Sequence, residues 1–272
     1  MWKAATYLVL VAAVVFSLAP LWIILVLALE DAPQAQELSP WRLPVSPGLG
    51  NFAALLAHTD FVRWLANSIV VSLAVTAIGV LLSATAGYAL SRFRFFGRLA
   101  VLNGVLTTQI FPATMLLLPI FLILVQLKLI NTFIGLILIY LATALPFCVW
   151  QMKNFYDSVP ESVEEAAAMD GCTPGEIFRK VVIPVSAPGL VVTALFSFAA
   201  SWNEYVVAAI LLQDAELFTL PLGLRLLHAD SAGGMPSLFA AGAVLVSVPV
   251  LVLYLVLSRF LVARVQDIRI RF

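Results

Sequence analysis

The sequence predicts an all-α membrane protein with six transmembrane helices and one cytoplasmic loop of unusual pattern. Of its 272 residues, 62% are hydrophobic and 11% are charged, whereas a soluble domain carries about 25% charged residues. A hydrocarbon core about 30 Å thick needs about 20 apolar residues per helix. Six stretches meet this length: residues 4–29, 65–90, 99–125, 133–152, 190–212 and 238–262.

The first apolar stretch, residues 4–29, lies where a signal peptide would be found. Its length exceeds the 7 to 15 apolar residues of a signal peptide, and only Lys3 precedes it as a basic residue. We therefore expect a retained anchor. Several of the six stretches contain Gly, Pro, Ser or Thr, which spanning helices tolerate because neighbouring groups satisfy the freed backbone.

Lysine and arginine indicate the orientation of these spans. With six spans, eleven of the fifteen basic residues lie on one side of the membrane and four lie on the other. Positive charge marks the cytoplasmic face, so both termini are expected inside. The external segments are then residues 30–64, 128–132 and 213–237. The formal net charge of zero argues against nucleic acid as a partner.

The longest cytoplasmic loop, residues 153–184, contains two helix-start patterns. Ser158 to Glu161 and Thr173 to Glu176 each combine a capping hydroxyl residue, a proline and a glutamate. Gly171 lies between them, where a helix often stops in a left-handed conformation. The loop is therefore predicted to form two helices too short to span, at about 159–170 and about 174–182.

The first of these helices separates into two faces when it is wound at 100° per residue. Its apolar face consists of Val159, Val163, Ala166 and Ala167. Its acidic face, expected to point outward, consists of Glu161, Glu164 and Glu165, with Ala168 among them. Arginines of a basic partner could bind such carboxylates bidentately. A solvated loop helix, whose glutamates favour the N-terminal dipole, has the same pattern, and periodicity does not decide between the two.

The loop resembles the EAA loop of ABC importer permeases, which reads EAA, three residues, Gly, nine residues and I-x-L-P. Here Glu165-Ala166-Ala167 is followed at these spacings by Gly171 and by Val181-Val182-Ile183-Pro184. Val181 and Ile183 are mild departures. The resemblance implies a coupling helix that docks into a cleft of an ATP-hydrolysing subunit, with Glu165 paired to an arginine there. The residues assigned to ATPase coupling are Glu161, Glu164, Glu165, Ala166, Ala167, Asp170, Gly171 and Pro184.

The resemblance covers almost the whole chain and favours the carbohydrate branch, similar to maltose-type and glycerol-3-phosphate-type permeases. Its further marks are Asn51-Phe52, Asn67-Ser68, Gly87 to Arg92, Phe96-Gly97-Arg98, Asn131-Thr132, Pro146-Phe147 and Trp202 to Tyr205. It implies a type I ABC importer permease fold, with residues 1–272 as one transmembrane domain. The terminal sequence ARVQDIRIRF departs from the Gly-Ala-Val-Lys-Gly-like tail of many relatives.

The resemblance implies import of a sugar or oligosaccharide across a bacterial or archaeal cytoplasmic membrane, with glycerol-3-phosphate or another small solute as the alternative. The implied partners are a second, different permease chain, a dimer of ATPase subunits, an extracytoplasmic solute-binding protein and membrane lipid. ATP and Mg²⁺ would be bound by the ATPase subunits, and this chain would bind no cofactor. None of the fifteen basic residues lies mid-span, which favours a neutral cargo.

The sequence offers no pattern for an enzyme. It has no Gly-Lys dipeptide and hence no phosphate-binding loop of the GxxxxGK[ST] type. Neither its two cysteines nor its two widely separated histidines have the spacing of a disulfide or a metal site. A secondary transporter would share the six spans, but it would have no reason to carry the capped, acidic helix pair.

Trp202, Asn203 and Glu204 interrupt the fifth apolar stretch. A carboxylate at mid-bilayer costs about 3 kcal/mol even on lenient scales, so Glu204 should face protein or water. Two roles remain open for this segment. It lines or braces a translocation path, as broken helices at substrate sites do, or it makes a fixed interhelical hydrogen bond.

Overall fold

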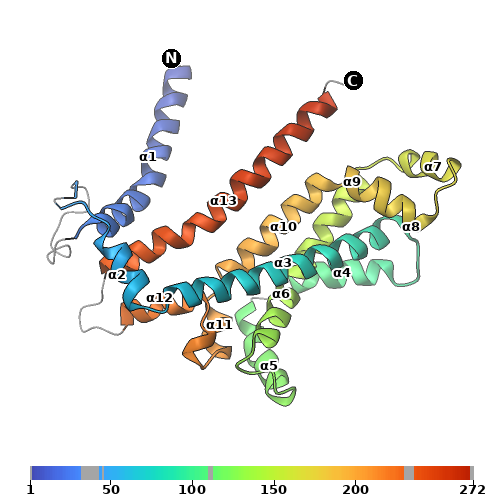
Figure 1. Ribbon diagram of the computed structural model, residues 1–272. Helices are drawn as coiled ribbons and strands as arrows, with labels where there is room; N and C mark the ends of the chain where they lie inside the picture. Colours follow the sequence, from blue (N-terminus) through green and yellow to red (C-terminus); the bar gives the residue numbers. More distant parts are fainter. Residues whose placement is uncertain (1, 32–42, 45, 110–112, 230–235, 270–272) are drawn as a thin grey trace. The chain divides into compact units, whose positions relative to one another are not determined.

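The computed structural model describes residues 2–31, 43–44, 46–109, 113–229 and 236–269 (Figure 1). Within these ranges the regular structure is helical, apart from one isolated bridge between Glu30 and Pro47. This confirms the all-α part of the predicted fold class. Among the described residues, four helices are each long and apolar enough to cross a bilayer, and one bent pair would make a fifth span: Ala5–Leu29, Phe61–Arg92, Phe133–Asp157, Pro236–Ser258, and Pro174–Val185 with Ala187–Trp202.

The chain divides into two compact units, one of Met1–Ala66 with Phe218–Leu251 and one of Asn67–Leu217 with Val252–Phe272. The first contains α1 (Trp2–Leu29), α2 (Gly50–His58), α12 (Leu220–Ala229) and the start of α3 (Phe61–Arg92) and α13 (Pro236–Arg269). Its helices approach closely where glycine leaves room. A Cβ on Gly223 would lie 2.1 Å from the Trp64 ring, and one on Gly242 would lie 2.3 Å from Leu224.

The end of α1 is held by polar contacts within the same unit. The amide of Asn51 donates to the carbonyl oxygens of Ala28 and Glu30 at 3.1 and 2.9 Å. The buried carboxylate of Glu30 accepts from the backbone N–H of Ser46 at 3.0 Å. Because the last carbonyls of a helix have no partner within the helix, Asn51 supplies the donors that the end of α1 needs.

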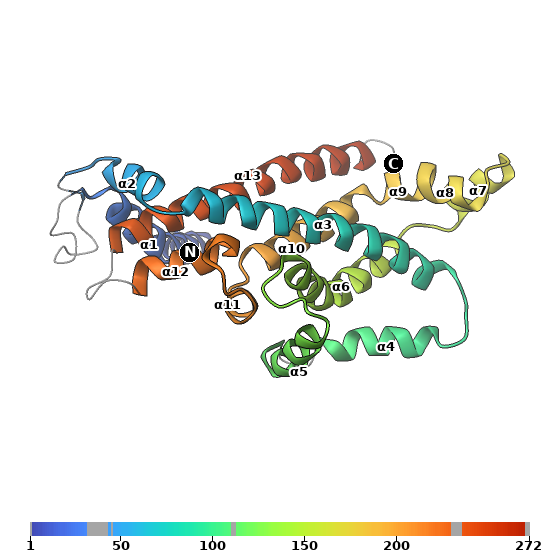
Figure 2. The same ribbon diagram turned by 60° about the horizontal axis from the view of Figure 1, so that its bottom comes forward.

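The second unit is built around α6 (Phe133–Asp157), which packs against α4 (Arg98–Thr108), α5 (Ala113–Gln126) and α10 (Ala187–Trp202). Small residues mark the helix crossings here as well. A Cβ on Gly87 of α3 would lie 2.8 Å from Cβ of Met152, and one on Gly189 of α10 would lie 2.6 Å from the Phe155 ring. In Figure 2, α7 (Ser162–Met169) and α8 (Pro174–Ile177) lie beyond the end of α6.

Two of the predicted apolar stretches form more than one helix. Residues 99–125 contain α4 and α5, and residues 110–112 between them lie outside the described part of the chain. Residues 190–212 contain most of α10, a break at 203–205, and α11 (Val206–Leu211). The polar run predicted to interrupt the fifth stretch is therefore a true helix break. A short 3-10 turn, Ala215–Leu217, follows α11.

Pro184 explains how the chain turns from the loop of residues 153–184 into α10. A π-helical segment, Phe178–Val182, follows α8 and leads into α9 (Ile183–Val185), with the N–H of Ile183 bonded to the carbonyl of Phe178. Proline has no N–H, so the regular helical bonding cannot continue through it. The axis then bends by 74° before α10. The helical segment predicted over 174–182 therefore extends to Val185, and its residues Phe178–Val182 are π-helical.

The close crossing of α3 and α6 leads to a stability prediction. Gly87→Ala places a methyl group against backbone and Cβ atoms that cannot move aside, so unfolding should become easier by about 1–3 kcal/mol. Gly104→Ala is the matched control, because a Cβ there meets nothing within 4 Å. Thermal unfolding of the purified chain in mild detergent measures both. Equal stability of the two variants would contradict the close crossing.

Candidate functional site

The segment that leads from α6 into α7 differs from its predicted form. The hydroxyl of Ser158 donates to the carbonyl of Phe155 at 2.6 Å and so completes the end of α6. α7 begins at Ser162 with Glu161 as its N-cap, and this cap has no side-chain hydrogen bond. The predicted capping role of Ser158 for the first loop helix is wrong, because its hydroxyl is already used by the preceding helix.

The segment that leaves α7 follows the prediction. Gly171 has a φ of +85°, the left-handed region that glycine reaches without strain. The predicted capping box of Thr173 and Glu176 is present at the start of α8. Glu176 accepts from the Thr173 N–H at 3.0 Å and pairs with Lys180 at 2.7 Å. Lys180, with the Thr173 contacts, lowers the pKa of the Glu176 carboxyl to about 2.

The inner side of α7 rests on a small apolar core. Ala167 is buried in a cluster with Met152 and Tyr156 of α6, Ile177 of α8 and Val182. The predicted inward orientation of Val159 and Ala167 is confirmed, since both are buried. Val163 and Ala166 are exposed, and the prediction is wrong for them. The helix is shorter than predicted, and fewer residues of its apolar face are buried.

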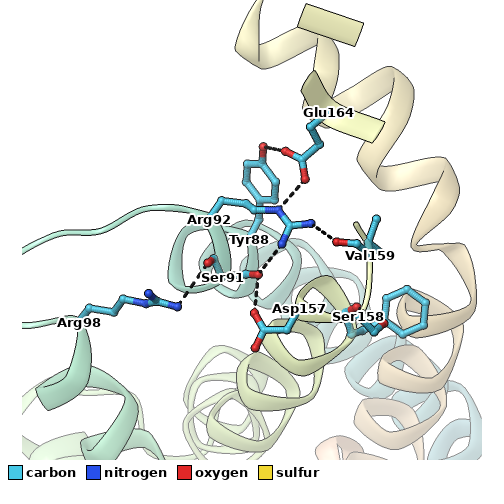
Figure 3. A network of polar contacts seen from close by, with 9 residues as sticks. Tyr88, Ser91, Arg92, Arg98, Asp157, Ser158, Val159 and Glu164 are labelled. Atoms are coloured by element: carbon cyan, nitrogen blue, oxygen red, sulfur yellow. Dashed lines mark hydrogen bonds and ion pairs between the residues drawn. The ribbon is translucent and has the colours of Figure 1, made fainter. Parts of the chain in front are cut away.

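Glu164 is held by two side chains from the end of α3, as Figure 3 shows. Arg92 Nε donates to Oε1 of Glu164 at 2.6 Å, and the Tyr88 hydroxyl donates to Oε2 at 2.7 Å. Arg92 also donates through Nη2 to the carbonyl of Val159 at 2.8 Å. The side chains of Arg92 and Glu164 are only 10% and 15% exposed. The predicted outward orientation of Glu164 is therefore wrong.

Further contacts join the ends of α3, α4 and α6 beside this ion pair. The Ser91 hydroxyl donates to Oδ1 of Asp157 at 2.7 Å, and Lys153 pairs with Oδ2 at 2.5 Å. Arg98 donates to the carbonyl oxygens of Leu90 and Ser91 at 2.8 and 3.3 Å. Three helices thus meet at one polar cluster, and α7 is attached to that cluster through Glu164 (Figure 3).

Tyr88 and Arg92 belong to the family mark Gly87 to Arg92, and their role in holding Glu164 was not predicted. The Tyr88 ring packs on Phe178 with centroids 4.8 Å apart and meets the edge of Tyr156 at 5.7 Å. A signal existed in the sequence, because a tyrosine and an arginine four residues apart share one face of the α3 end. Their partner could not be identified from spacing, since Glu164 is 72 residues beyond Arg92.

The outer side of α7 combines carboxylates with small and flexible side chains. Glu161, Glu165, Ala166 and Ala168 are exposed, and Met169 is 89% exposed. In the part of the chain that the structure describes, neither Glu161 nor Glu165 forms an ion pair. Asp170 and Gly171 continue this exposed surface. The surface therefore offers two unpaired carboxylates on a helix that is fixed from its opposite side.

Glu204 lies at the break between α10 and α11 and is fully engaged within the chain. Its carboxylate accepts from the Tyr140 hydroxyl of α6 at 3.0 Å, and from the backbone N–H groups of Val207 and Ala208 at 3.0 to 3.3 Å. It therefore satisfies the free donors at the start of α11. Trp202 is buried and stacked on Phe198, whereas Asn203 is exposed.

Within the described residues, no three His, Cys, Asp or Glu side chains are grouped as a metal site requires. The polar clusters of the second unit join helices to one another or face outward on α7. Together with the apolar spans, they define the class as a multi-pass helical membrane protein with a structured segment between α6 and α10.

The comparison with protein families then identifies the chain. The family described as "Binding-protein-dependent transport system inner membrane component" matches residues 79–269, and the chain belongs to this family. The trehalose transport system permease protein SugB of Mycobacterium tuberculosis is 32% identical to it, with 96% of each chain covered. The maltose/maltodextrin transport system permease protein MalG of Salmonella typhimurium is 33% identical, covering 94% of this chain and 90% of MalG.

A solved structure has the same fold. A chain from the crystal structure of a bacterial ABC transporter involved in the import of the acidic polysaccharide alginate superimposes with a TM-score of 0.83. The match covers 95% of this chain and 96% of the other, at 24% sequence identity. The shared fold is that of an ABC importer permease.

The contacts of Glu204 lead to a prediction that separates its two candidate roles. Glu204→Ala leaves the N–H groups of α11 and the Tyr140 hydroxyl unsatisfied, so stability should fall by about 1–3 kcal/mol. Glu204→Gln keeps one acceptor oxygen, so it should lose less stability than Glu204→Ala. Thermal unfolding and solute uptake are measured for both variants. Normal stability with lost uptake in Glu204→Gln would indicate a path role, whereas no change in either would remove both roles.

Proposed function

We propose that this chain is a permease subunit of an ATP-driven importer for a sugar or oligosaccharide, coupled to a separate ATPase through the outer face of α7. The observation that carries this proposal is the exposed pair of carboxylates, Glu161 and Glu165, on a helix fixed from behind. The chain's family and its similarity to permeases named for trehalose and maltose transport support the class of function.

The outer face of α7 suits a basic cleft on a soluble partner. Exposed carboxylates bind arginine through paired, charge-assisted hydrogen bonds. The neighbouring alanines, Ala166 and Ala168, allow a partner backbone to approach, and Met169 adds an adaptable apolar contact. Glu165 is the residue we assign to an arginine of the ATPase, and Gly171 with Asp170 shapes the turn that follows.

In this assembly the chain contributes transport and not hydrolysis. ATP and Mg²⁺ are bound by a dimer of ATPase subunits, a second permease completes the path, and an extracytoplasmic binding protein delivers the solute. Both termini lie on the cytoplasmic side of a bacterial or archaeal membrane. ATP binding can drive the permease between states only if α7 has a different contact free energy with the ATPase in each state.

The transported solute is, in this proposal, a neutral carbohydrate. Similarity to permeases for trehalose and maltodextrin favours a neutral carbohydrate over glycerol-3-phosphate. At the break between α10 and α11, Glu204 is occupied by helix-capping contacts. We assign it a bracing role beside the path, with Asn203 as the exposed polar side chain that a solute could reach.

The assigned ATPase contact is tested by charge reversal. Glu165→Arg places a positive charge opposite the expected arginine, and like charges across an interface cost several kcal/mol. Solute uptake at normal expression should fall by more than about tenfold, and less ATPase should co-purify with the permease.

The control for this variant is Glu176→Arg, which reverses a charge of the same loop on α8, at a residue that pairs with Lys180 and is not assigned to the ATPase contact. Equal loss in both variants would show a general effect of charge on the loop. Normal uptake and normal ATPase recovery in Glu165→Arg would contradict the contact.

The cargo class is tested by uptake into proteoliposomes that contain the complete importer and its binding protein. Radiolabelled maltose, trehalose and glycerol-3-phosphate are compared with and without internal ATP. We expect ATP-dependent accumulation of at least one of the two sugars. Accumulation of glycerol-3-phosphate alone would contradict the carbohydrate assignment while retaining the importer class.

A further inference from the structure

α7 and the residues just before it are held to α3 by contacts of two α3 side chains. Both oxygens of Glu164 are occupied by donors of α3, at 2.6 Å from Arg92 and 2.7 Å from Tyr88. A third contact, from Arg92 to the carbonyl of Val159 at 2.8 Å, holds the chain just before α7. Contacts at three separate points resist rotation of the short helix as well as its translation.

The surroundings of these contacts make them hard to open. Arg92 and Glu164 are nearly shielded from water, and separating a buried ion pair leaves each charge without compensation. The Tyr88 ring is packed between Phe178 and Tyr156. Gly87, next to it, lets α3 lie close to the backbone of α6, because it has no side chain. Movement of α7 away from α3 would disturb both the charges and this packing.

The two backbone connections of α7 restrict its position less than these side-chain contacts do. The chain enters from α6 through residues 158–161 and leaves toward α8 through residues 170–173, both of which are turns. The N-cap of α7 has no side-chain hydrogen bond. If α7 were connected to the spans only through these turns, changes in the backbone dihedral angles of the turns would take up part of any movement of α7.

We propose that Arg92 and Tyr88, by binding Glu164, make α7 and the end of α3 move as one rigid body, so that force on α7 reaches α3 directly. Glu164 is thus a positioning residue and not a contact for the ATPase. This inference rests on the proposed coupling function of α7 for its role in transport. The clamp itself, defined as Tyr88, Arg92 and Glu164, is a property of this chain.

The clamp is tested by electron–electron spin distance measurements on the purified complex with its ATPase and second permease. Labels are placed by Arg94→Cys, just after α3, and Ser162→Cys, at the start of α7, both of which are exposed positions that the proposed ATPase contact does not use. The native cysteines, Cys148 and Cys172, are replaced by alanine. Distances are recorded without nucleotide and after trapping with Mg-ATP and vanadate.

The clamp predicts one narrow distance distribution that is the same in both states. Glu164→Gln removes the ion pair, so its distribution should be about twofold broader or shift between states, because a neutral partner no longer holds the arginine. Glu176→Gln is the matched control, since it makes the same charge change in this loop without contacting α3. It should behave like the parent.

Two further variants keep the test decisive where Glu164→Gln fails to assemble. Tyr88→Phe removes one hydrogen bond and retains the ion pair, so it should broaden the distribution less. Exchange of the two charges, Arg92→Glu with Glu164→Arg, should be narrower than either single change. If the clamp residues were needed only for folding, the assembled variants would not show this order in the widths of their distance distributions.

The results that overturn the clamp differ from those that overturn the coupling function. A parent distance that changes on nucleotide trapping, or a Glu164→Gln distribution as narrow as the parent, contradicts the clamp. Failure of any ATPase to co-purify with the parent chain contradicts the coupling function instead. In that case the widths measured without nucleotide still decide whether the clamp exists.

Discussion

The need to satisfy backbone groups at helix ends governs the second unit and the end of α1. The first N–H groups and the last carbonyls of a helix have no partner within the helix, so where they are shielded from water they must find a partner elsewhere in the protein. Asn51 supplies donors to the end of α1, and Glu204 supplies acceptors to the start of α11. Asn131 accepts from the backbone N–H groups of Gln213 and Asp214 and donates to the carboxylate of Asp214. These polar residues therefore allow breaks and turns that an apolar chain could not adopt there.

The three glutamates of the α7 segment illustrate how neighbours in sequence acquire different roles. Glu164 lies between α3 donors and is nearly buried, whereas Glu161 and Glu165 remain exposed. A helix places residues i and i+1 about 100° apart, so Glu164 and Glu165 point in clearly different directions. One carboxylate can thus fix the helix to the membrane domain while its neighbour stays free to bind another chain. This separation suits the connecting role that we propose for this helix of eight residues.

The proline and glycine residues between α7 and α10 set the direction of the connection. Gly171 ends α7 with a left-handed residue, and Pro184 accompanies a π-helical segment before the 74° bend. Ser186 and Pro188 then begin α10. Proline removes a donor that a straight helix would need, and this loss is tolerated where the helix changes form. α8 and α10 are therefore joined through a bent segment that keeps helical hydrogen bonds on both sides of Pro184.

The sequence by itself determined the membrane class, the six apolar segments and the loop helices bounded by Gly171 and the capping box of Thr173. These features follow from local properties: hydrophobic length, proline position and the preference of glycine for positive φ. Only the tertiary structure decided that Ser158 serves α6, that Glu164 turns inward, and that Glu204 caps α11. Each of these depends on a competing partner, and for Glu164 that partner is a helix more than seventy residues away. Spacing fixes which residues share a face of one helix, but burial and charge from distant helices select which of them turns inward.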